Sequence, residues 1–215
     1  MTNPNYIHEI LLIDRSGSMS AILAETRGGI HDHIEQQRAL PGLNTITIVT
    51  FNGGHEVVRQ RESLATVKSL EKGEFEPSGM TALYDAMAAA IDSEGAWIAS
   101  LPEDQRPHKV LMMVVTDGME NASMETTQAA LRERVERQTN LYGWDFTYMA
   151  ANQDAILNAG AIGIVAANAI NFAPTPAGMR AAMHVSSAAA RGYKVGGGVG
   201  GQSVFSASHV DDLAP

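Results

Sequence analysis

The segment from Lys109 to Thr116, with the sequence KVLMMVVT, constrains the fold of this chain more than any other. It is almost entirely apolar, as is typical of a central strand in a parallel sheet whose two faces are both covered. Further strands are predicted at Tyr6 to Ile13, Asn44 to Phe51 and Trp144 to Met149. Because longer helical patterns separate these strands, the sequence predicts an α/β protein with a mainly parallel sheet and helices on both faces.

The helical patterns cover residues 19–40, 81–100, 124–139, 154–165 and 176–193. Gly28-Gly29 weakens the middle of the first helix, and Gly160 and Gly163 interrupt the fourth. Asn52-Gly53-Gly54 is a hairpin signal, so residues 55–60 are expected to return antiparallel beside the preceding strand. Residues 61–77 are predicted to be weakly helical or irregular, and residues 169–172 to form a brief edge strand.

The charge balance excludes several classes of partner. Lys and Arg number 15 and Asp and Glu 24, so the net charge is −9. An acidic surface repels nucleic acid and anionic membranes, and we expect neither as a partner.

The absence of cysteine excludes disulfide scaffolds, zinc fingers and thiol catalysis. The apolar run Ile10 to Ile13 is too short for a signal sequence or a membrane span, so we expect a soluble, cytoplasmic protein.

The character of the sequence changes after Lys194. Residues 196–201 are glycines broken only by Val199, and the remaining residues are mostly small and polar. We therefore predict a domain over residues 1–194 and a flexible, Gly-rich tail over residues 195–215. Because such a tail has little apolar surface to bury, truncation after Lys194 is expected to leave the thermal midpoint within a few degrees.

Two acidic residues follow predicted strands, and ligands of a doubly wound sheet collect at such strand ends. Asp14 closes the first strand and opens the run Asp14-Arg15-Ser16-Gly17-Ser18, and Asp117 follows the central strand. One carboxylate and two hydroxyls at alternate positions can converge on a magnesium-like cation if the loop curls around it. Purely structural roles stay open, because Asp14 can form an Asx turn, Asp117-Gly118 an ordinary turn, and either serine a helix cap.

A third segment favours the metal site over these structural roles. In Ser78-Gly79-Met80-Thr81, Thr81 is predicted at a helix start, and the order Asp14-x-Ser16-x-Ser18, Thr81, Asp117 resembles the von Willebrand factor A domain with an intact metal-ion-dependent adhesion site. The resemblance covers roughly residues 6–192. It implies a six-stranded sheet with one short antiparallel edge strand, in agreement with the predicted hairpin. Among members of that family, the chain is most similar to small stand-alone proteins of bacteria and their phages.

The resemblance also assigns roles to the site residues. It implies that Ser16 and Ser18 bind the metal directly, and that Thr81 does so directly in one state and through water in another. Asp14 and Asp117 correspond to carboxylates that often reach the ion through water. The implied ion is Mg²⁺, with Mn²⁺ or Ca²⁺ as alternatives, and one coordination position stays open for a Glu or Asp of a partner protein. We expect the Asp14 loop to face solvent.

The function expected from these features is a non-catalytic, metal-dependent protein-binding module. The alternative is a magnesium-dependent phosphoryl-transfer enzyme, which also places an Asp at the end of its first strand. In phosphatases of that kind a second acid follows two positions later, whereas this chain has Ser16, which is no proton shuttle at neutral pH. A third possibility is a scaffold that has lost its metal. Glu120-Asn121, next to Asp117, is predicted either to tune the charge of the site or to lie in an exposed loop.

Overall fold

The computed structural model describes residues 1–151, 155–196 and 204–205. Within these residues, six strands form one sheet in the order β3-β2-β1-β4-β5-β6. All neighbouring strands are parallel except β2 and β3, which are antiparallel at one edge. The strands are β1 (Asn3–Asp14), β2 (Leu43–Phe51), β3 (His55–Ser63), β4 (Pro107–Thr116), β5 (Trp144–Ala150) and β6 (Ala169–Asn171).

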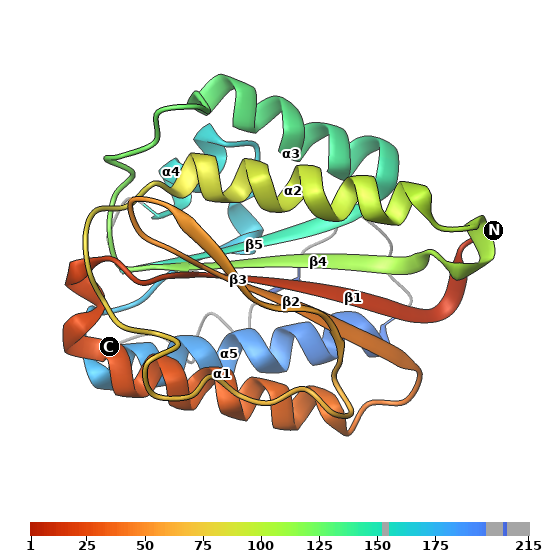
Figure 1. Ribbon diagram of the computed structural model, residues 1–215, viewed down its shortest axis with the longest axis horizontal. Coiled ribbons are helices and arrows are strands. Elements are labelled where there is room, and N and C mark those ends of the chain that lie inside the picture. Colours follow the sequence, from red (N-terminus) through yellow and green to blue (C-terminus); the bar gives the residue numbers. More distant parts are fainter. Residues whose placement is uncertain (152–154, 197–203, 206–215) are drawn as a thin grey trace.

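Helices cover both faces of this sheet (Figure 1). On one face α1 (Leu23–Arg38) packs beside α5 (Pro176–Val195), and on the other lie α2 (Leu83–Ser100), α3 (Gln128–Tyr142) and the short α4 (Ala155–Ala161). Three 3₁₀ segments are also described: η1 (Gly17–Ile22), η2 (Glu103–Gln105) and η3 (Ala166–Asn168). The predicted doubly wound, mainly parallel α/β sheet with one antiparallel edge strand is therefore confirmed, and so is the hairpin that makes this edge.

The core is divided into two layers by the sheet. Successive side chains of a strand point to opposite faces. Leu11 and Ile13 of β1 accordingly pack toward α1 and α5, whereas Ile10 and Leu12 pack toward α2 and α3. Among the described residues, no helix is both long and apolar enough to cross a membrane.

The carboxyl ends of the parallel strands all meet at one end of the sheet, on the left in Figure 1. The segment that follows β1 and the loop that follows β4 both lie at this end. These are the two places where the sequence puts Asp14 and Asp117, so the topology alone brings the two halves of the predicted site close together.

The first helix differs from its prediction. The chain forms the 3₁₀ segment η1 before α1 begins at Leu23, and α1 continues without a break through Gly28-Gly29. Gly29 faces α5, and a Cβ there would lie 2.5 Å from Cγ of Met183 and 2.6 Å from its Cβ. The glycine therefore allows close packing of α1 on α5 rather than weakening the helix.

Gly29→Ala should lower the free energy of unfolding by about 1–3 kcal/mol, since Met183 must move for the new methyl group to fit. The matched control is Gly28→Ala, where a Cβ would meet nothing within 4 Å. That variant should stabilise the protein by up to about 1 kcal/mol through helix propensity. Urea unfolding followed by circular dichroism measures both, and equal effects at the two positions would contradict the packing role of Gly29.

The C-terminal segment requires a correction. Most of the predicted tail over residues 195–215 lies outside the described residues, but Val204 and Phe205 are described and both are buried. They belong to the hydrophobic cluster on the α1–α5 side, and the backbone N–H of Val204 donates to Oδ1 of Asn168 at 2.6 Å. The expectation that the tail has little apolar surface to bury is wrong at these two residues.

Truncation after Lys194 should accordingly destabilise the domain. Burial of a Val or Phe side chain contributes about 1.5–3 kcal/mol, part of which offsets the entropy lost on ordering the segment. A net loss of about 2 kcal/mol would lower the thermal midpoint by about 4–8 °C. The full chain with Val204→Ser and Phe205→Ser should show a similar loss in a thermal melt, and an unchanged midpoint in both proteins would restore the expectation from the sequence.

Candidate metal centre

Asp14 is the last residue of β1, and each oxygen of its carboxylate accepts a hydrogen bond. Oδ1 accepts the backbone N–H of Ser16 at 2.6 Å, and Oδ2 accepts the hydroxyl of Thr116, at the end of β4, at 2.6 Å. The first of these bonds is the Asx turn considered as a structural alternative. Asp14 is fully buried and Ser16 nearly so, which corrects the expectation of solvent exposure for these two residues, whereas Gly17 and Ser18 of the same loop are exposed.

The two serine hydroxyls lie together beside Asp117. Oγ of Ser16 is 3.1 Å from Oγ of Ser18, and the Ser18 hydroxyl donates to Oδ1 of Asp117 at 2.6 Å. Ser16 is the N-cap residue of η1, but its side chain makes no capping hydrogen bond. Its hydroxyl therefore stays available to a ligand, and helix capping does not account for this serine.

Thr81 is brought to the same place by the loop before α2. The helix begins at Leu83, two residues later than predicted, and Thr81 is buried. Its backbone N–H donates to Oδ1 of Asn121 at 2.9 Å, and the N–H of Asn121 donates back to the Thr81 carbonyl at 3.0 Å. This reciprocal pair fixes the loop before α2 against the loop after β4.

Gly118 marks the point on which these oxygens converge. A Cβ at this position would lie 3.2 Å from Oγ1 of Thr81, 3.7 Å from Oγ of Ser18 and 3.8 Å from Oδ2 of Asp14. Because Ser16 and Asp117 contact Ser18, the structure places all five predicted residues around one point. The glycine leaves room there that any other residue would fill.

Glu120 and Asn121 lie in the loop after β4, where Asn121 is exposed and Glu120 half-buried, and both make hydrogen bonds that hold this loop next to the site. The Glu120 carboxylate accepts the N–H of Tyr84 in the first turn of α2 at 3.0 Å and the N–H groups of Ala122 and Ser123 at 2.9 and 2.7 Å. In return, Asp85 of α2 accepts backbone N–H groups of residues 124–126. The loop after β4 and the start of α2 are therefore joined by hydrogen bonds in both directions.

The electrostatics of the site fit a cation. Burial raises the pKa of Asp14, and it also raises the pKa of Asp117. Within the described part of the chain, neither carboxylate has a Lys, Arg or His as an ion-pair partner, and the neighbouring Arg15 pairs instead with Glu56 at 3.3 Å. Two carboxylates and three hydroxyls form an all-oxygen donor set, which suits hard ions such as Mg²⁺, Mn²⁺ or Ca²⁺.

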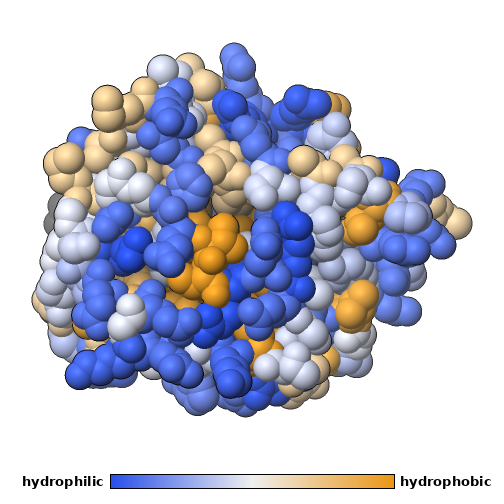
Figure 2. Space-filling model, viewed as in Figure 1, coloured by the Kyte–Doolittle hydropathy of each residue, from blue (hydrophilic) through white to orange (hydrophobic). Residues whose placement is uncertain are grey.

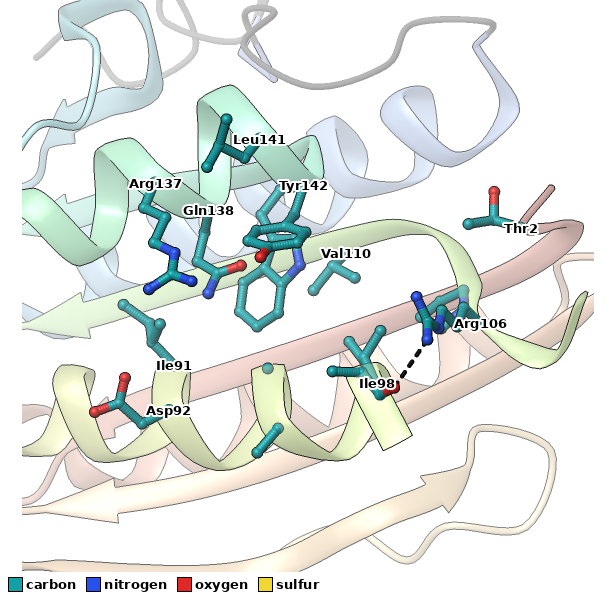
Figure 3. Close-up of a pocket in the computed structure, with 15 residues that line it drawn as sticks. Thr2, Ile91, Asp92, Ile98, Arg106, Val110, Arg137, Gln138, Leu141 and Tyr142 are labelled. Carbon is teal, nitrogen blue, oxygen red and sulfur yellow. Dashed lines mark hydrogen bonds between the residues drawn. The ribbon is translucent and has the colours of Figure 1, made fainter. Parts of the chain in front are cut away.

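A cavity of about 470 Å³ lies at the opposite end of the sheet and contains none of these five residues. Figure 3 shows Arg137, Gln138 and Tyr142 of α3 facing Ile91 and Ile98 of α2 across it. The convergence of oxygens at Gly118 is thus separate from this cavity.

No model of a known protein family matches this sequence, and no curated protein is similar to it. Solved structures are similar in fold. A von Willebrand factor type A protein from Catenulispora acidiphila matches with a TM-score of 0.55 at 16% identity over 86% of this chain and 42% of its own. The ArnB paralog VWA2 from Sulfolobus acidocaldarius matches with a TM-score of 0.52 at 16% identity, over 84% of this chain and 44% of its own.

A third similar structure is proximal thread matrix protein 1 from the mussel byssus, with a TM-score of 0.58 at 13% identity over 87% of this chain and 46% of its own. The chain thus spans less than half the length of each of these three proteins. At these identities the similarity concerns the fold, and it places this chain among domains with the von Willebrand factor A fold.

Proposed function

We propose that this chain is a non-catalytic protein-binding module whose cation site is completed by a carboxylate of a partner protein. The observation that carries the proposal is the convergence around Gly118 of two carboxylates and three hydroxyls with no basic side chain among them. Buried carboxylates are costly unless a positive charge compensates them. A divalent cation, Mg²⁺ or alternatively Mn²⁺ or Ca²⁺, would supply that charge.

The exposure of the site residues supports binding of a partner from one direction. Asp14, Ser16 and Thr81 are buried beneath the site, whereas Ser18 is exposed and Asp117 is half-buried. A cation held by this set would be covered by protein below and accessible from the end of the sheet. Hard cations prefer charged oxygen ligands, so Glu or Asp is the expected partner residue.

The phosphoryl-transfer alternative has less support. Ser16 stands where a general acid would be expected, and the Glu120 carboxylate is already engaged by three backbone N–H groups. Arg15, the nearest basic residue in sequence, pairs with Glu56. A phosphatase assay with Mg²⁺ separates the two functions, because turnover that is lost in Asp14→Asn would favour the enzyme.

The direct test of the proposal is electron paramagnetic resonance of added Mn²⁺. We expect one Mn²⁺ to bind per chain, and acetate to change its spectrum while acetamide, the neutral isostere, does not. Asp14→Asn should weaken Mn²⁺ binding. This variant is preferable to Asp14→Ala, which would also leave the Thr116 hydroxyl and the Ser16 N–H without an acceptor at a cost of about 1–3 kcal/mol. Failure to bind Mn²⁺ would overturn the proposal.

A further inference from the structure

The cavity of about 470 Å³ between α2 and α3 contains no residue of the candidate metal centre, and the proposed function does not use it. α2 contributes three small residues to its lining, Gly95, Ala96 and Ala99, so the two helices leave a space between them. A Cβ at Gly95 would lie 3.3 Å from Nε2 of Gln138 on α3, so this amide lies against the glycine. The volume is within the range of about 300–1,000 Å³ that is typical of small-molecule sites.

The inner wall of the cavity is apolar. Val110 of β4 and Trp144 of β5 line it from the sheet and Ile91 lines it from α2, and all three side chains are buried. Most of the face shown in Figure 2 is hydrophilic, apart from a hydrophobic patch near its centre. Leu141 and Tyr142, at the end of α3, are by contrast 72% and 57% exposed, and both line the cavity. An aromatic or branched apolar group in the cavity would contact the buried wall and these exposed side chains.

The polar side chains of the lining include two donors without an acceptor. Asp92 of α2 is engaged, because Nε of Arg134 donates to its two carboxylate oxygens at 3.2 and 3.1 Å. Arg137, three residues further along α3, forms no ion pair or hydrogen bond with any described residue, and the same holds for the side-chain amide of Gln138. Figure 3 shows both side chains extending from α3 toward α2. A guanidinium and an amide therefore face the cavity side by side.

A second arginine lines the cavity near the end of α2. The Arg106 guanidinium donates to the carbonyl of Ala99 at 2.8 Å, shown by the dashed line in Figure 3, and to that of Leu101 at 2.9 Å. These carbonyls orient the guanidinium, but they are neutral and do not cancel its charge. Arg106 and Arg137 thus outweigh Asp92, so the lining is positive although the net charge of the chain is −9.

We infer that this cavity binds a small organic carboxylate with an aromatic or branched aliphatic body. The carboxylate lies at Arg137 and Gln138, and the body lies against the apolar wall at Trp144 and Ile91. Hydrogen bonds between a guanidinium and a carboxylate are charge-assisted and correspondingly strong. A cationic ligand would be repelled by the two arginines, and a neutral one would leave their charge uncompensated. The inference does not depend on the proposed function, because the candidate metal centre lies at the opposite end of the sheet.

The test is titration of the full chain with naphthylacetate, a probe that has both the apolar body and the carboxylate. In two-dimensional amide NMR spectra, we expect chemical-shift changes centred on residues 91–99 and 137–144. Naphthylacetamide, the neutral isostere, should bind at least about tenfold more weakly, because it loses the charge-assisted hydrogen bonds. Acetate, which has no apolar body, should cause no changes there at the same concentration.

Two variants with matched controls test where the probe lies. Gly95→Leu places a side chain in the cavity and should abolish binding, whereas Gly28→Leu, within α1 where a Cβ would meet nothing within 4 Å, should not. Arg137→Met should weaken binding of naphthylacetate by about tenfold and leave that of naphthylacetamide unchanged. Arg132→Met, which removes the partner of Glu136 on the same helix, should change neither affinity.

Arg137 is exposed, so its variant keeps the test decisive even if Gly95→Leu fails to fold. Equal affinities for the acid and the amide, or an affinity for naphthylacetate that is unchanged in Arg137→Met, would overturn the inference of an anion held by Arg137. The cavity would be excluded as a ligand site if naphthylacetate did not bind at millimolar concentration, shifted only residues elsewhere, or still bound to a folded Gly95→Leu variant.

Discussion

Gly118→Val should abolish divalent-cation binding while the domain stays folded. The first carbon of the new side chain would lie 3.2 Å from Oγ1 of Thr81 and within 4 Å of Ser18 and Asp14. The two methyl groups beyond it would fill the space on which the donor oxygens converge. Titration with Mn²⁺ should show an affinity at least about 100-fold lower than that of the wild-type chain, a difference of about 2.7 kcal/mol.

The matched control is Gly53→Val in the turn between β2 and β3. A Cβ there meets nothing within 4 Å, so Mn²⁺ binding should be unchanged. Circular dichroism and thermal melts check that both variants fold. If Gly118→Val bound Mn²⁺ as tightly as the wild type, the donor oxygens would have to converge somewhere else.

The sequence indicates the side chains of this centre but not the residues that hold them. Asp14, Ser16, Ser18 and Asp117 draw attention as oxygen donors at strand ends, and the resemblance to the von Willebrand factor A domain joins them with Thr81 into one site. The roles of Thr116 and Asn121 cannot be read from the sequence, because both residues act through hydrogen bonds between segments distant in sequence. Likewise, the importance of Gly118 lies in what surrounds it.

The strands are predicted more accurately than the starts of the helices. β4 and β5 differ from their predictions by at most two residues at an end, since apolar runs show directly where a chain is buried. The helix predicted from Met124 begins at Gln128 instead. The Asp85 carboxylate holds the backbone of residues 124–126 outside the helix, and Thr127 caps its first turn. In residues 124–126, contacts with the distant Asp85 therefore override the helical pattern of the local sequence.

Buried charge is the feature of the core that the sequence pattern conceals. The apolar run of β1 predicts a buried strand, yet Glu9 beside it is also buried. Its carboxylate contacts Nζ of Lys194 on α5 and accepts Nε2–H of His33 on α1 at 2.7 Å. Burial lowers the pKa of His33 to about 4, so the ring is neutral at pH 7. Burial also lowers the pKa of Lys194, to about 7, and its contact with Glu9 makes it the cation that can compensate this carboxylate.

Lys194→Met should lower the free energy of unfolding by about 3–5 kcal/mol, because it leaves the buried Glu9 carboxylate without a positive partner. His33 would still donate one hydrogen bond, but as a neutral ring it does not compensate the charge. For a domain of this size, the thermal midpoint should fall by roughly 10 °C. Urea unfolding and a thermal melt at pH 7 measure the effect.

Two comparisons distinguish the loss of stability caused by a buried unpaired charge from the loss that follows removal of any basic residue. Arg132→Met removes one partner of the exposed Arg132–Glu136 pair, and it should change stability by less than about 0.5 kcal/mol. Glu9→Gln combined with Lys194→Met removes both charges, and it should recover much of the stability lost in Lys194→Met alone. If Lys194→Met were within about 1 kcal/mol of the wild type, the link between β1 and α5 would not depend on the charges of Glu9 and Lys194.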